Sequence, residues 1–167
     1  AIRWLGKRWT VLGGRIGIVD DRPVLTPSGG DIPVEVKDSR EMSDAEGLAW
    51  QRSRLKTPFR LDRGPLLRAH LLEGAARTSV LLVAHHVVFD GGSTVLVLGA
   101  LRQAIDALVA GERLPGAMSS GGYAAYLSAE QARTEGAEGP RRLRWWRETL
   151  SDIAPAAPLP SDQPRGS

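Results

Sequence analysis

The first 37 residues show two hydrophobic patterns, one typical of a helix and one typical of strands. Apolar residues recur among basic ones over residues 1–12, which predicts a short amphipathic helix. The apolar segments 15–19 and 24–25 flank the turn-forming residues 20–23, and this pattern predicts a β-hairpin. Residues 32–37 alternate apolar and polar side chains, which is the period of a half-buried strand. We therefore expect a helix, a hairpin and one further strand in this segment.

A clear helix start follows that strand. Ser43 and Glu46 have the spacing of a capping box, in which the hydroxyl and the carboxylate bond free amides of the first helical turn. The helix is expected to run to about Leu55, and Pro58 ends it.

Two apolar segments, 66–72 and 79–84, predict a second β-hairpin. The second of these strands is apolar on both faces, as expected of a central strand that is covered on both sides. Ser93 is the expected N-cap of the next helix, and Gly111 its terminator. Apolar residues recur in this helix at helical spacing: Val95, Leu96, Leu98, Leu101, Ile105, Leu108 and Val109. This helix should pack on the sheet behind the turn that precedes it.

The remaining chain predicts two helices and a tail. Residues 123–133 form the first helix, residues 136–140 a break, and residues 141–150 the second helix. Trp145 and Trp146 are interpreted as packing anchors rather than as platforms for a ligand. We expect one domain over residues 1–152 and a proline-rich, extended linker over 153–167.

Composition narrows the classes of function. The 167 residues are 42% hydrophobic and 25% charged, which is ordinary for one globular domain with a sizeable core. Cysteine is absent, which excludes disulfides, a thiol nucleophile and cysteine metal sites. No apolar stretch reaches the roughly 18 residues of a membrane helix, and the N-terminus lacks the order of a signal peptide. We expect a cytoplasmic protein with no membrane contact.

The net charge of +3 and the pI of about 9.8 reflect basic residues that are spread along the chain. One local basic cluster covers residues 141–147. Nucleic-acid binding needs a longer basic face with aromatic residues placed to stack, so we expect no nucleic-acid partner. A solvated helix face, or a patch for an acidic protein partner, explains the cluster better.

The candidate chemistry lies in residues 85–92, His-His-Val-Val-Phe-Asp-Gly-Gly, between the second hairpin and the long helix. Consecutive side chains at a strand end point to opposite faces, so only one of His85 and His86 can enter a given cleft. The same divergence makes the pair a poor metal chelator. A single histidine could act as an acid, a base or a hydrogen-bonding group. Two histidines at a strand end are, however, more often satisfied hydrogen-bond partners than catalysts.

The residues after the histidines extend this hypothesis. Asp90 is expected to orient the turn rather than to act as a nucleophile. Gly91 and Gly92 remove side chains where a substrate could approach the backbone, and they lead into a helix N-terminus whose amides favour negative charge. A histidine beside such amides suits acyl transfer.

The segment His85 to Gly91, with its His-His-x-x-x-Asp-Gly pattern, resembles the signature of the chloramphenicol-acetyltransferase-like superfamily. Within it, the chain resembles the N-terminal lobe of the condensation domains of nonribosomal peptide synthetases. Residues 58–68, 143–150 and 159–164 resemble further segments of these domains, with similar spacing, so the likeness covers roughly residues 55–165. The resemblance implies an α/β (α+β) fold, in which a mixed, largely antiparallel sheet packs against helices.

The resemblance also implies a reaction and partners. Condensation domains join a donor acyl thioester to an acceptor amine, both held on phosphopantetheine arms of carrier proteins. Donor and acceptor carrier proteins and neighbouring synthetase or polyketide synthase domains would be the partners, and the chain itself would bind no cofactor. His86 would position the amine or take its proton, and His85 would be largely structural. Asp90 would hold the turn through a salt bridge, with Arg68 as a candidate partner, and Gly91 would leave room beside the thioester carbonyl.

Two departures from the family pattern leave alternatives open. Residues 8–15 only weakly match the His-then-Leu-Arg-Thr pattern that follows the first helix in the family, and the second lobe is absent. The chain is therefore expected to be either a fragment of a longer protein or a non-catalytic half-domain for docking or structure. A trimeric acyltransferase that uses coenzyme A or lipoamide carries the motif near its C-terminus, whereas more than seventy residues follow His86 here. The substrates, stereochemistry and product are not predicted.

Overall fold

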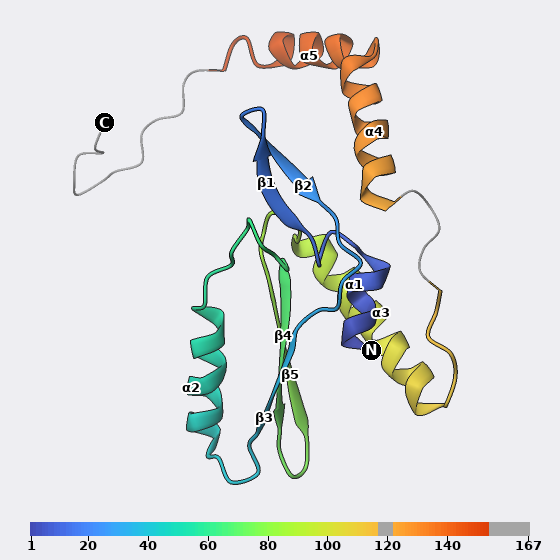
Figure 1. Cartoon of the computed structure of the whole chain (residues 1–167). Helices are drawn as coiled ribbons and strands as arrows, with labels where there is room; N and C mark the ends of the chain where they lie inside the picture. The colour runs from blue at the N-terminus through green and yellow to red at the C-terminus, as the bar shows by residue number, and fades with distance from the viewer. Residues whose placement is uncertain (117–121, 154–167) are drawn as a thin grey trace, which may run out of the picture. The chain divides into compact units, whose positions relative to one another are not determined.

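The computed structural model describes residues 1–116 and 122–153, which form two compact units that divide after Gly122. Figure 1 shows the elements in chain order. Those of the first unit are α1 (Ile2–Arg8), β1 (Arg15–Val19), β2 (Arg22–Thr26), β3 (Val34–Asp38), α2 (Asp44–Leu55), β4 (Leu67–Glu73), β5 (Thr78–Ala84) and α3 (Gly91–Val109). Those of the second unit are α4 (Gly122–Glu135) and α5 (Glu138–Thr149). Each predicted helix and strand is confirmed, although α1 is shorter than expected.

A three-stranded sheet organises the first unit, with the strand order β3-β4-β5. β3 is parallel to β4, and β4 is antiparallel to β5. The prediction that the second strand of this hairpin is central was wrong, because β4 is the central strand and β5 lies at the edge. An apolar pattern reports which faces of a strand are covered, and it does not report which neighbours the strand pairs with. β1 and β2 form a separate antiparallel hairpin, as predicted.

The two faces of the sheet have different coverings (Figure 1). α1 and α3 cover one face, where alternate residues of β4 join the main hydrophobic core. That core consists of Trp4, Leu5, Leu12, Ile32, Leu67, Ala69, Val97, Ala100, Leu101 and Ala104. α2 lies on the opposite face, and its start matches the prediction, because Ser43 and Glu46 form the capping box. α2 buries only Gly47, so apolar packing contributes little to its attachment.

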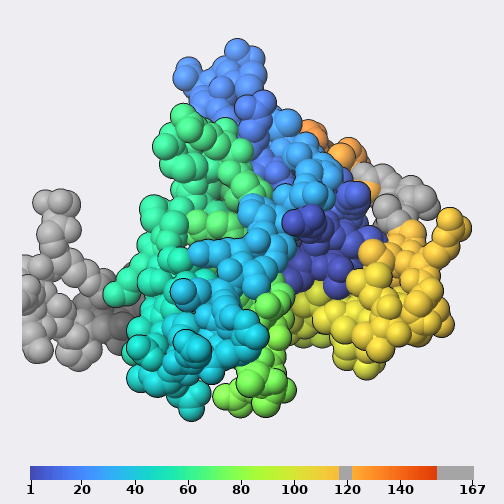
Figure 2. All heavy atoms as spheres, turned by 60° about the horizontal axis from the view of Figure 1, so that its bottom comes forward, coloured from blue at the N-terminus to red at the C-terminus, as the bar shows by residue number. Residues whose placement is uncertain are grey.

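The α3 helix packs into the core, as predicted, through four buried residues. Figure 2 shows the N-terminal residues beside the C-terminal part of α3, where the Trp4 indole Nε1 donates a 2.9 Å hydrogen bond to the Pro115 carbonyl. By length and composition alone, α3 is the one described helix that could cross a membrane. This is weak evidence, since helices that contribute to a protein core pass the same test. Gly111 has the positive φ of 72° that suits the end of a helix.

The second unit differs from the prediction in the extent of the break between its helices. The break between its helices is only Gly136 and Ala137, because α5 already begins at Glu138. Pro140 therefore lies in the first turn of α5, where a helix does not need the missing amide. Trp145 and Trp146 are 55% and 52% exposed, and their interpretation as packing anchors stays a prediction. Nearly all of the expected linker, 153–167, lies outside the described residues, so the domain boundaries stay a prediction.

Candidate functional site

The motif forms a tight turn between the end of β5 at Ala84 and the start of α3 at Gly91. The His85 amide donates a 2.9 Å hydrogen bond to the Leu66 carbonyl, which ties the turn to the residue before β4. The Val88 amide bonds the His85 carbonyl at 3.1 Å and closes the turn. The backbone therefore holds the two histidines at the edge of the sheet, immediately before a helix N-terminus.

His85 is half-buried and held from two sides. Its Nδ1 accepts a 3.2 Å hydrogen bond from the Val87 amide, so a neutral ring carries its proton on Nε2. Its ring meets that of Phe59 edge-on, with centroids 5.8 Å apart and planes at 88°. These contacts agree with the structural role that the resemblance implied for His85.

His86 is exposed, and its side chain makes no hydrogen bond to any described residue. Both histidines lie beyond the last residue of β5, so the turn, and not strand alternation, separates their side chains. The division into one packed and one accessible histidine is as expected. The exposed imidazole can accept or donate a proton. Its catalytic role stays a prediction.

Asp90, and not Ser93, caps α3. The Asp90 carboxylate accepts hydrogen bonds of 2.7 Å from both the amide and the hydroxyl of Ser93, and the Ser93 hydroxyl accepts one from the Asp90 amide. The two residues form a reciprocal capping box in which the predicted cap, Ser93, is the third helical residue. The Ser93 hydrogen bonds hold the pKa of Asp90 below its usual value.

The expected salt bridge between Asp90 and Arg68 is absent, and Asp90 forms no ion pair with any described residue. Arg68 instead donates to the main-chain carbonyls of Thr57, at 2.6 Å, and Pro58, at 3.4 Å. Its guanidinium carbon lies 4.0 Å from the centroid of the Phe59 ring. Arg68 thus reaches the motif indirectly, through the ring that also contacts His85.

Gly91 and Gly92 open α3 in free space. A Cβ atom at Gly91 would meet nothing within 4 Å, and one at Gly92 would meet only the Asp90 carboxylate, at 3.5 Å. Neither glycine is required by local packing, and the expectation that a side chain is absent to leave room for a substrate stays a prediction. The Asp90 carboxylate already places a negative charge at this helix N-terminus, which weakens the attraction of its amides for an oxyanion.

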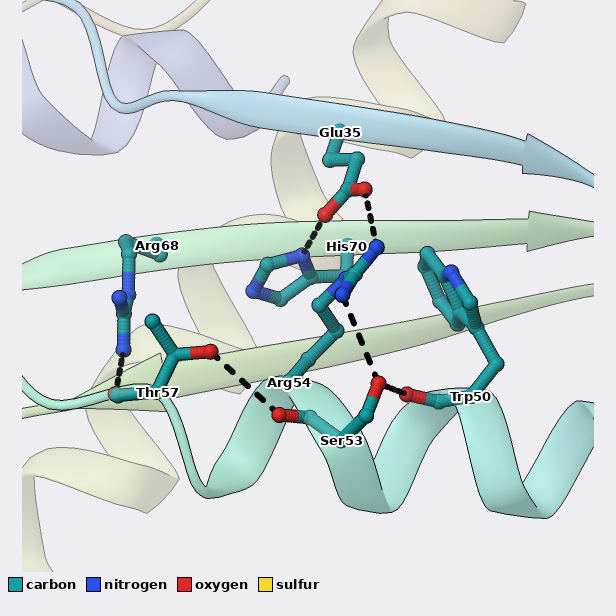
Figure 3. A network of polar contacts seen from close by, with 7 residues as sticks. All are labelled: Glu35, Trp50, Ser53, Arg54, Thr57, Arg68 and His70. Atoms are coloured by element: carbon teal, nitrogen blue, oxygen red, sulfur yellow. Dashed lines mark hydrogen bonds and ion pairs between the residues drawn. The ribbon is translucent and has the colours of Figure 1, made fainter.

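A second polar cluster, which was not predicted from the sequence, lies between α2 and the sheet and contains Glu35, Arg54 and His70 (Figure 3). Glu35 and His70 are direct partners in the β3–β4 register, so their side chains share one face. Alternation along residues 67–73 could have shown that His70 lies opposite the core residue Ala69, but not which residue it meets. Within residues 1–116 and 122–153, no group of three or more acidic or histidine side chains is placed to hold a metal ion.

The mixed sheet with helices on both faces and the histidine turn at its edge define a lobe of the chloramphenicol-acetyltransferase-like fold. The model of the Condensation domain family matches residues 30–167, and the chain belongs to this family. Solved structures support the same fold. The chain has a TM-score of 0.75 and 26% identity to the first condensation domain of the calcium-dependent antibiotic synthetase, covering 92% of this chain and 38% of that one. The epimerization domain from the third module of tyrocidine synthetase B gives a TM-score of 0.81 at 17% identity, over 96% of this chain and 37% of that one, and shows the fold alone.

The curated relatives are very large proteins. The polyketide synthase PksN of Bacillus subtilis (strain 168) is 34% identical over 131 residues, which are 78% of this chain and 2% of PksN. One component of the linear gramicidin synthase of Brevibacillus parabrevis is 36% identical over 123 residues, which are 73% of this chain and 2% of that component. The chain therefore spans a small part of these relatives and less than half of a solved condensation domain.

Proposed function

We propose that this chain is the N-terminal lobe of a condensation domain that transfers an acyl group from a thioester to an amine. The substrates would be held on phosphopantetheine arms of donor and acceptor carrier proteins, with neighbouring synthetase or polyketide synthase domains as further partners. The family match over residues 30–167 carries the proposal. The accessible His86 in the turn between β5 and α3 supports it. The cytoplasmic location expected from the sequence stays a prediction.

The described residues suggest a limited role for each part of the motif. His86 would accept the proton of the attacking amine or hold that amine in place, because its imidazole is unbonded and open. His85 would keep the turn in shape through Val87 and Phe59. Asp90 would fix the start of α3 through Ser93. The thioester carbon forms a bond to the amine nitrogen and breaks its bond to sulfur, and the proton lost by the amine passes to the leaving thiolate.

The test is a condensation assay of the native protein that contains this chain, with loaded donor and acceptor carrier proteins. His86→Ala should lower product formation by about 100-fold or more, which is the lower range for removal of a general acid–base group. Arg102→Ala is the matched control, because Arg102 is an exposed residue of α3 whose one ion-pair partner among the described residues is Asp106. It should leave the rate unchanged.

Product formation that is equal in His86→Ala and the wild type would refute the catalytic role of His86. Carrier-protein binding without turnover by the wild-type protein would instead support the non-catalytic half-domain, and it would exclude this chain from the condensation step.

A further inference from the structure

The place of the His86 imidazole depends on the backbone of the turn that carries it. His86 is exposed, and its side chain forms no hydrogen bond within the described residues. The Val88 amide bonds the carbonyl of His85 at 3.1 Å, and the Val87 amide bonds Nδ1 of the His85 ring at 3.2 Å. The peptide units on both sides of His86 are therefore held at His85.

The bond from the Val87 amide exists in one orientation of the His85 ring. Nδ1 can accept it only when the ring is turned toward the amide and carries its proton on Nε2. Hydrogen bonds weaken steeply as their angle closes, so a rotation of the ring breaks this one. It is also the one hydrogen bond that the ring makes to a described residue. The orientation of the ring therefore depends on packing, and the Phe59 ring meets it at a centroid distance of 5.8 Å with planes at 88°.

Arg68 in turn holds Phe59, which lies between α2 and β4 in a segment that is neither helix nor strand. The Arg68 guanidinium donates hydrogen bonds to the carbonyls of Thr57, at 2.6 Å, and Pro58, at 3.4 Å, the two residues before Phe59 (Figure 3). Its carbon lies 4.0 Å from the centroid of the Phe59 ring. Arg68 thus acts on the backbone that carries Phe59 and on the ring itself, from the central strand of the sheet.

We propose that Arg68 and Phe59 are positioning residues for the condensation reaction, and this inference rests on the proposed function. Arg68 orients the Phe59 ring, that ring orients His85, and His85 holds the two peptide units that place His86. Asp90 fixes the other end of the turn, at the start of α3. The substrates remain bound through their carrier proteins when Arg68 or Phe59 is replaced, so the loss should appear in kcat rather than in KM.

The first test reads the His85 ring in the full chain through its ring ¹⁵N signals, at about pH 8.5, where a free imidazole is neutral. In the wild type, the Val87 bond should keep Nδ1 unprotonated and Nε2 protonated. Phe59→Leu and Arg68→Met should each shift the two His85 signals toward the average of the two tautomers. Phe59→Tyr keeps an aromatic ring and should retain the wild-type signals. The unbonded His86 ring is the internal reference, and its signals should be the same in every variant.

The second test is the condensation assay of the native protein that contains this chain. Phe59→Leu and Arg68→Met should each lower kcat by about tenfold and leave KM unchanged, because the turn places His86 correctly for only part of the time. Phe59→Tyr should keep the wild-type kcat. Leu114→Ala is the control for lost stability, because Leu114 packs against the main core beyond the far end of α3 from the turn. It should keep both the wild-type kcat and the His85 signals.

Three results would each overturn the proposal. They are a wild-type kcat in Phe59→Leu, unmoved His85 signals in that variant, and a loss of kcat in Leu114→Ala as large as that in Phe59→Leu. Equal product formation by His86→Ala and the wild type would refute the proposed function instead. The His85 signals would then still decide whether Arg68 and Phe59 hold the turn, since that readout does not depend on catalysis.

Discussion

Phe59 joins Arg68 to the histidine turn, and its replacement should destabilise both. The Arg68 guanidinium carbon lies 4.0 Å from the centroid of the Phe59 ring, and the Phe59 and His85 rings meet edge to face with their centroids 5.8 Å apart. Burial lowers the pKa of Arg68, so this cation is partly removed from water and its contact with the ring is stronger than at an open surface. We expect about 1 kcal/mol from the cation–π contact and about 1 kcal/mol from the edge contact.

Phe59→Ala should therefore lower the free energy of unfolding by about 2–3 kcal/mol, because it also loses the burial of a half-exposed ring. Phe59→Leu keeps most of the apolar volume but lacks the electron-rich face of the aromatic ring. It should lower the free energy of unfolding by about 1–2 kcal/mol. Urea denaturation, followed by circular dichroism, measures both values. Hydrogen exchange of the Val87 amide, which bonds the His85 ring, should also become faster.

A double-mutant cycle isolates the contact between Phe59 and Arg68. Phe59→Leu, Arg68→Met and the double variant should give a coupling energy of about 0.5–1 kcal/mol, since Arg68→Met alone also loses the bonds to Thr57 and Pro58. The reasoning fails if the coupling is zero within error, or if Phe59→Leu is as stable as the wild type.

Two further predictions concern Asp90 and Glu35. Asp90→Ala should lower the urea midpoint, whereas Asp90→Ser should largely preserve it, because serine also caps helices. Equal losses in both variants would show that the charge of Asp90 matters, and not its capping of α3 through the Ser93 amide. Glu35→Gln should be less stable than the wild type at neutral pH, where Glu35 is bonded to Arg54 and His70. The folded pKa of Glu35 is lowered, so its contribution is present above the unfolded pKa and is lost as the pH falls through the folded pKa. The difference between the two proteins should therefore shrink in acid, and a difference that grows in acid would contradict this.

Local patterns were enough to predict most of the elements. The capping box of Ser43 and Glu46 sets the start of α2, and the alternation in residues 15–25 gives the first hairpin, because both depend on residues close in sequence. The parallel pairing of β3 with β4 was not predictable in this way. Its register joins Glu35 to His70 across 35 positions, so the polar cluster follows from a long-range pairing that no local pattern records.

The histidine turn shows the same division between local and long-range information. Asp90 and Ser93 are both good N-cap residues three positions apart, so composition alone allows either one to begin α3. The hydrogen bond from the His85 amide to the Leu66 carbonyl fixes where the chain leaves the sheet. The helix then begins at once, with Asp90 as its cap. The carboxylate is thereby bonded to Ser93, while Arg68 is bonded to carbonyls after α2. In this chain Asp90, which lies four residues after His86, sets the position of His86 by fixing the start of α3. A neutral capping residue at position 90 should serve that purpose equally well.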